Sequence, residues 1–130
     1  MRILVIGGTG TIGQSVVSEL SSRHKVISAG HQNGEVRVNI ADKNSIEQMF
    51  QSVGTVDAVI STTGKVHFGA FPELTEEHYA LGLNNKLMGQ VNLVSIGLNY
   101  LNDNGSFTLT SGVLNRDPIR LGSSAAMVNG

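Results

Sequence analysis

The sequence has 130 residues and no cysteine, which excludes disulfides, thiolate metal sites and cysteine nucleophiles together. It also lacks long Lys or Arg runs, and its formal net charge of −1 gives no bulk attraction to nucleic acid or anionic membranes. We therefore expect neither as a partner. We also expect no metal site, because the histidines share no i, i+4 spacing that would place two ligands on one helical face. The histidines are His24, His31, His67 and His78.

Signals for export and membrane insertion are missing at the start of the chain. The opening MRILVIGG carries one charge and a short apolar run, which is too short for a membrane span and lacks a signal-peptide layout. We expect a soluble, cytoplasmic protein. The hydrophobic fraction of 40% is enough for a buried core, and the length suits one domain.

Apolar runs and helical periodicities alternate along the chain. Continuous apolar runs predict strands that are buried on both faces, at residues 3–6, 25–29, 36–40, 56–61 and 106–110. Between them, helical spacing predicts helices at residues 12–20, 43–53 and 79–101, with a short helix started by Thr75 and another opening in the tail GSSAAMVNG. Asp42 and Gly54 are good caps for the second helix. The long helix carries an apolar stripe that we expect to face inward, formed by Leu83, Leu87, Val91, Val94, Leu98 and Leu101.

This alternation predicts an α/β fold, a doubly wound parallel sheet of the Rossmann type in three α/β/α layers. The six-stranded version has strand order 3-2-1-4-5-6, and five strands can be counted here. We expect one Rossmann domain over residues 1–130, with the C-terminal part of the fold missing from the chain.

A glycine-rich turn joins the first strand to the first helix. The spacing of Gly7, Gly10 and Gly13 is Gly-x-x-Gly-x-x-Gly. The first glycine permits a tight turn, the second a close approach of the pyrophosphate, and the third close packing of helix on strand. Free N–H groups at the helix start then bind the anion. A P-loop is excluded because no Gly-Lys-Ser/Thr follows. The predicted dinucleotide contacts here are Gly7, Thr9, Gly10, Thr11, Ile12 and Gly13.

The end of the second strand bears on which dinucleotide is bound. NAD sites place Asp or Glu there for the ribose 2′-OH, whereas this chain has Ser28 followed by AGHQNG. No carboxylate repels a 2′-phosphate, and His31 can become cationic. We therefore favour NADP(H), with NAD(H) possible; the alternative is that GHQNG is only a polar turn.

Together these motifs resemble the short-chain dehydrogenase/reductase family, as an atypical member. The resemblance covers essentially the whole chain and rests on GGTGTIG at 7–13, VNIAD at 38–42, DAVISTTG at 57–64, KLMGQVNLV at 86–94 and FTLTSG at 107–112. The glycine spacing is closer to the extended and atypical branches than to the common form of the family. The resemblance implies further cofactor contacts at Asn39, Ile40, Ser61, Thr62, Thr63 and Gly64.

The family's catalytic set of Asn, Ser, Tyr and Lys is matched only in part. The resemblance makes Ser111 the serine that orients the substrate carbonyl, and it places Lys86 where the helix asparagine should stand, three residues before Gly89. A lysine there could take part in proton relay; alternatively, it is a solvent-exposed helix lysine. No Tyr or Lys follows residue 111, so the Tyr-x-x-x-Lys dyad either lies beyond the chain or is absent.

These observations leave three functions open. The first is an NAD(P)-dependent oxidoreductase that transfers hydride between the nicotinamide and a small carbonyl or alcohol substrate. The second is a non-catalytic NADP(H)-binding regulatory or redox-sensing domain. The third is an S-adenosylmethionine methyltransferase, which is disfavoured because an acidic residue is lacking at the end of the second strand. Since the long helix is apolar on more than one face, and such helices commonly build subunit interfaces in the family, we also expect a homodimer or homotetramer.

Overall fold

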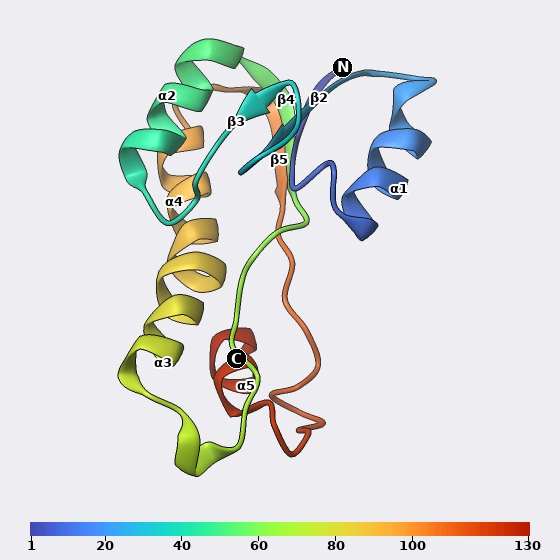
Figure 1. Cartoon of the computed structure of the whole chain (residues 1–130). Helices are drawn as coiled ribbons and strands as arrows, with labels where there is room; N and C mark the ends of the chain where they lie inside the picture. Colours follow the sequence, from blue (N-terminus) through green and yellow to red (C-terminus); the bar gives the residue numbers. More distant parts are fainter.

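A five-stranded parallel sheet organises the computed structural model, which describes residues 1–130 (Figure 1). The spatial order is β3-β2-β1-β4-β5, as the sequence predicts. The strands are β1 (Arg2–Ile6), β2 (Lys25–Gly30), β3 (Val36–Arg37), β4 (Val56–Ser61) and β5 (Leu101–Thr108). The helices are α1 (Thr11–Ser21), α2 (Lys43–Val53), α3 (Glu76–Gly82), α4 (Met88–Gly97) and α5 (Ser123–Asn129), with a 3₁₀ turn at Phe71–Glu73 and a π-helical segment at Leu83–Leu87.

The helices cover both faces of the sheet. Figure 1 shows α1 on one face and α2 with α4 on the other, which confirms the predicted three-layer α/β/α arrangement. In the central strand β1, Leu4 and Val5 are fully buried, because each face is covered by a helix layer. No helix in the structure combines the length and hydropathy needed to cross a bilayer.

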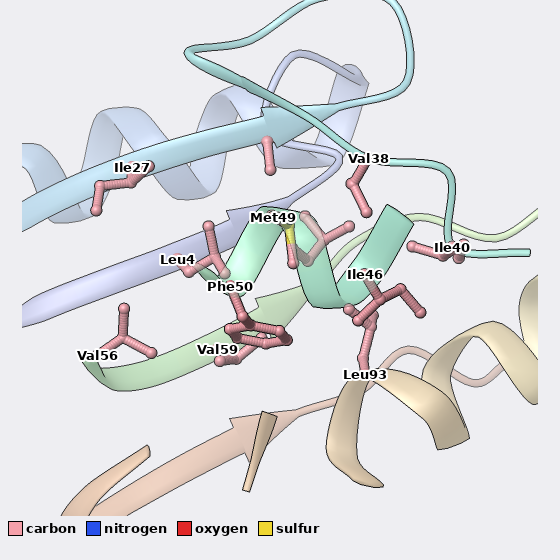
Figure 2. Close-up of a cluster of buried hydrophobic side chains, with 12 residues drawn as sticks. Leu4, Ile27, Val38, Ile40, Ile46, Met49, Phe50, Val56, Val59 and Leu93 are labelled. Carbon is pink, nitrogen blue, oxygen red and sulfur yellow. The ribbon is translucent and has the colours of Figure 1, made fainter. Parts of the chain in front are cut away.

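One hydrophobic cluster lies between the sheet and the α2/α4 layer (Figure 2). Phe50 of α2 is fully buried there, and its ring stacks on Tyr100 with 5.2 Å between the centroids. Both predicted caps of α2 are confirmed. The Asp42 side chain accepts a hydrogen bond from the Asn44 N–H at 2.9 Å, and Gly54 has φ 82°, a conformation that glycine adopts without strain.

The third strand is shorter than expected. Residues 36–40 were predicted as strand, but ladder pairing ends at Arg37, opposite Gly30. Beyond it, Val38 and Ile40 are still buried in the cluster. The apolar pattern of residues 36–40 therefore reflects burial against α2 and not strand pairing. Asn39 bends the chain, since its side chain accepts a hydrogen bond from the Ala41 N–H at 3.1 Å.

The prediction for residues 79–101 is wrong in two respects. The helix ends at Gly97, and Leu101 already belongs to β5, which begins five residues earlier than the predicted strand. Residues 102–105 form an irregularity in the β4–β5 pairing, with Asn104 at φ 64°. The turn-like NDNG sequence therefore lies within β5, where it disturbs the pairing with β4, and does not terminate a helix.

The predicted inward stripe of this helix is also wrong. Leu87, Val91 and Leu98 are exposed, while Leu93 is fully buried. Gly97 allows the side of the helix that carries Leu93 to pack closely on the core. A Cβ added at Gly97 would lie only 2.8 Å from the Phe50 ring. The helix carries apolar residues on both sides, so periodicity alone could not select the buried one.

The chain extends beyond the carboxyl ends of the strands, where α3 and α5 lie (Figure 1). Thr75 caps α3 as predicted, in a capping box with His78. The His78 ring also stacks on that of His67, with 3.8 Å between the centroids. The loops after β4 and β5 thus connect the sheet to this outer pair of helices.

Candidate functional site

The glycine turn has the geometry that its spacing predicts. Gly7 has φ 81°, and its N–H donates to the Ala29 carbonyl at 2.7 Å. The Gly10 N–H then donates to the Gly7 carbonyl at 3.0 Å, which closes the turn. At Gly13 an added Cβ would lie only 1.9 Å from the Gly7 oxygen. Gly13 is therefore the position at which α1 lies directly on the end of β1.

The N-terminus of α1 presents backbone donors without intrachain acceptors. The first N–H drawn into the helix is that of Gln14, which donates to the Gly10 carbonyl at 2.8 Å. The N–H groups of Thr11, Ile12 and Gly13 make no hydrogen bond within the chain, and no side chain caps the helix. With no acidic residue in the first turn, these donors and the helix dipole suit an anion such as a pyrophosphate.

A cavity of about 410 Å³ opens beside this turn. Eight of the predicted cofactor residues line it: Gly7, Thr9, Gly10, His31, Asn39, Ile40, Thr62 and Thr63. The other five, Thr11, Ile12, Gly13, Ser61 and Gly64, do not line it. Thr11 and Ile12 are exposed at the start of α1, whereas Ser61 is only 1% exposed. The glycine cradle, the free donors and this cavity together fit a dinucleotide.

The end of β2 contributes no negative charge to the cavity. His31 lines the wall, and none of the lining residues is acidic. Across the β2–β3 ladder, Arg37 is the register partner of Gly30, so a guanidinium-bearing residue stands beside the end of β2. Lys65 also lines the cavity. Sequence reasoning missed both basic residues, because their positions depend on strand register and on the loop after β4.

Thr62 ties the end of β4 to the glycine turn. Its N–H donates to the Ile6 carbonyl at 2.9 Å, and its hydroxyl lies 2.9 Å from the same oxygen and 3.2 Å from the Gly7 oxygen. The hydroxyl thus holds the turn in place as well as lining the cavity. Gly64, at φ 146°, lies against the Lys86 side chain, where an added Cβ would be 2.6 Å from Lys86 Cγ.

A second cavity, of about 260 Å³, brings together the two predicted catalytic residues, Lys86 and Ser111. Lys86 belongs to the π-helical segment, and Ser111 follows β5. Partial burial lowers the pKa of the Lys86 ammonium below its usual value. The Ser111 hydroxyl donates to the Asn129 carbonyl at 2.8 Å, so α5 closes this cavity from the far side.

Gln90 fixes the position of Ser111 relative to Lys86. Its Nε2 donates to the Thr110 carbonyl at 2.8 Å and to the Lys86 carbonyl at 3.0 Å, and its Oε1 accepts from the Thr110 N–H at 2.8 Å. Gln90 is only 8% exposed. Sequence analysis missed this residue; the one available signal was a polar residue next to Gly89.

A family model described as NAD dependent epimerase/dehydratase family matches residues 3–110. The chain belongs to this family. A solved structure of a protein from Listeria innocua is 48% identical, with a TM-score of 0.97 over 100% of this chain. The chain spans 65% of the length of that protein. A search of curated sequences finds no match.

Two further solved structures support the same family. One is a small-chain dehydrogenase that is 30% identical over 99% of this chain and 69% of its own, with a TM-score of 0.90. The other is a small-chain dehydrogenase in complex with NADPH. It is also 30% identical, with a TM-score of 0.90, and the chain covers 58% of its length. The predicted resemblance to short-chain dehydrogenases/reductases is therefore confirmed.

Within this member of the epimerase/dehydratase family, neither tyrosine reaches the second cavity. The Tyr79 hydroxyl lies 3.2 Å from Ser123 Oγ, and the Tyr100 hydroxyl donates to Glu47 at 2.5 Å. In the family, the Tyr-x-x-x-Lys dyad begins roughly thirteen residues after the serine that Ser111 matches. That stretch forms α5 here, and it carries Ser124, Ala125, Val128 and Asn129 at the corresponding positions. Of these four, Val128 and Asn129 line the cavity.

Proposed function

We propose that the chain forms the dinucleotide-binding part of an NAD(P)-dependent oxidoreductase acting on a small carbonyl or alcohol substrate. The observation that carries this proposal is the glycine turn of α1, whose three free N–H groups stand beside the larger cavity. Membership of a family described as NAD dependent and the 30% identical dehydrogenase in complex with NADPH support it.

Each proposed contact has a physical role. The α1 donors and Thr9 hold the pyrophosphate, while Gly7 and Gly10 leave room for it. When bound, the nicotinamide supplies or accepts the hydride. The Ser111 hydroxyl turns from Asn129 to donate to the substrate oxygen, as a donor aimed at developing negative charge does. The Lys86 ammonium, in the same cavity, donates a proton to that oxygen when the carbonyl is reduced and regains one from solvent.

We propose NADP(H) as the preferred cofactor, with NAD(H) as a weaker ligand. A 2′-phosphate carries nearly two negative charges and favours a site with donors and no carboxylate. The larger cavity meets this requirement, since His31 and Lys65 line it and no acidic residue does. Arg37, beside Gly30, adds positive charge at the same edge of the sheet.

Fluorescence titration with NADPH and NADH tests the binding proposal, followed by turnover on a panel of aldehydes and ketones. We expect tighter binding of NADPH, and we expect His31→Asp to reverse the preference, since the carboxylate accepts from a ribose 2′-OH and repels a phosphate. Wild-type protein that prefers NADH would refute the NADP(H) assignment. Folded protein that binds neither dinucleotide would refute the proposed function.

A second candidate is a non-catalytic NADP(H)-binding regulatory or redox-sensing domain. The observation that favours it is the absence of any tyrosine lining the second cavity. This candidate would be favoured if both this chain and a longer polypeptide that contains it bound NADPH but turned over no carbonyl compound on the panel.

We also propose assembly into a homodimer or homotetramer. The exposed apolar side chains of Met88 and Leu98 support this proposal, because they lie at the two ends of α4 and line neither cavity. Sedimentation at micromolar concentration tests it, and a monomer would contradict it. The cytoplasmic location stays a prediction from the sequence.

A further inference from the structure

The smaller cavity contains one charged group that the chain leaves without a counter-ion. Lys86 is the one charged residue among those lining this cavity. The one ion pair in the structure joins Arg23 to Glu19, so no carboxylate lies within 4.0 Å of the Lys86 ammonium. A partly buried cation without a partner is unfavourable, and an anionic ligand would relieve this cost.

The Lys86 side chain is also held in place by its surroundings. The Lys86 Cβ and Cγ lie over Gly64. A Cβ added at Gly64 would be 2.9 Å from the Lys86 Cβ and 2.6 Å from its Cγ. Its backbone carbonyl accepts from Gln90 at 3.0 Å. The lysine stem therefore starts from a fixed position on the cavity wall, and this reduces the entropy lost when its ammonium binds a ligand.

The rest of the cavity combines a polar end with apolar walls. Ser111 and the side-chain amide of Asn129 provide the polar end. The apolar walls are formed by Leu87, Val91, Leu109 and Val128. A volume of about 260 Å³ is enough for a small molecule.

The two cavities meet at the π-helical segment. Asn85 lines the larger cavity and Lys86, the next residue, lines the smaller one. The Asn85 side chain is tied to the loop after β4, because its Oδ1 accepts from the Lys65 N–H at 2.7 Å. A ligand on Lys86 would therefore lie next to the proposed dinucleotide site.

We infer that the smaller cavity binds small carboxylates with an apolar body, with the carboxylate on Lys86 and the body against the four apolar side chains. This inference rests on the proposed function, and it narrows the substrate to 2-oxo or 2-hydroxy acids, in which the carboxylate and the reacting oxygen are on adjacent carbons and can both contact the Lys86 ammonium. A neutral carbonyl compound of equal size would leave the lysine charge uncompensated.

Three probes test this inference by NMR titration without dinucleotide: isovalerate, its neutral isostere isovaleramide, and acetate, which lacks the apolar body. We expect isovalerate to bind at least about tenfold more tightly than either of the others, which corresponds to about 1.4 kcal/mol. Lys86→Met should remove this advantage, and Lys86→Arg should retain most of it, because both variants keep the stem that lies over Gly64.

Lys25→Met is the matched control, since Lys25 is exposed at the opposite, amino end of β2. It should leave isovalerate binding unchanged. Equal binding of isovalerate and isovaleramide by folded wild-type protein would overturn the inference, as would unchanged isovalerate affinity in folded Lys86→Met. The dinucleotide titration described above is separate, so a protein that binds isovalerate through Lys86 but no NADPH would refute the proposed function alone.

Discussion

Gly13→Ala is the sharpest test of how the glycine turn creates the proposed dinucleotide site. The new Cβ would lie 1.9 Å from the Gly7 oxygen, 2.7 Å from the Gly7 carbonyl carbon and 2.8 Å from Gly8 Cα. All three neighbours are backbone atoms, so no side chain can rotate away. The first turn of α1 must therefore move by about 1 Å to restore ordinary packing distances.

This movement displaces the three free N–H groups of Thr11, Ile12 and Gly13 together. Hydrogen bonds to a charged group contribute about 1.5 to 3 kcal/mol each, so weakening them should cost at least about 2 kcal/mol. That corresponds to a loss of roughly thirtyfold or more in NADPH affinity. Fluorescence titration of NADPH measures the affinity, and circular dichroism checks that the variant is folded.

Two matched alanine variants separate binding from stability. At Gly10 an added Cβ would lie 3.3 Å from the Gly7 oxygen, so Gly10→Ala should have a smaller effect on affinity. At Gly54 nothing lies within 4 Å, but φ is 82° and ψ is −160°, so Gly54→Ala should cost about 1 to 3 kcal/mol of folding stability and leave NADPH affinity unchanged. Folded Gly13→Ala protein with wild-type affinity would refute the reasoning.

Three further variants test features of the fold. Gln90→Leu removes three hydrogen bonds and leaves the Thr110 backbone groups without partners, so urea denaturation should show a loss of about 2 to 4 kcal/mol; a loss below about 0.5 kcal/mol would contradict this role. Asp42→Ala should cost about 1 kcal/mol in the same assay, and an unchanged midpoint would argue against the N-cap. Hydrogen bonds from the Arg2 N–H and then from Asn102 lower the pKa of Asp57. This carboxylate therefore stabilises the fold at pH values above its ordinary pKa of about 4. The contribution is lost as pH falls through the lower pKa of the folded state. Asp57→Asn should therefore flatten the acid side of the stability profile, and an unchanged slope would count against the interaction.

The features that the sequence predicts well are those set by local sterics. Glycine is required at position 13 because α1 contacts the end of β1 there, and the glycine spacing alone predicts this contact. The N-cap Asp42 and the C-cap Gly54 are likewise local. The parallel direction of the strands follows from the alternation of strands and helices, because parallel strands need crossover connections.

The errors arise where distant parts of the chain decide the outcome. Helix α4 has apolar residues on both sides, and only packing against Phe50 and Phe107 selects the side with Leu93 and Gly97. The sequence at 102–105 has turn chemistry, but the pairing of β5 with β4 keeps it in a strand. The roles of Gln90 and Arg37 depend on hydrogen bonds and strand register that the sequence alone does not define.

The π-helical segment has a consequence for how this site could diversify during evolution. A π-helical turn is equivalent to one extra residue inserted into an α-helix, so deleting one residue of Leu83–Leu87 would restore regular helix while α3 and α4 keep their positions. Such a deletion would change which side chains this segment presents to the two cavities, where Asn85 and Lys86 now lie. Single-residue insertions and deletions here could therefore change ligand preference in one step, without altering the sheet that supports the site.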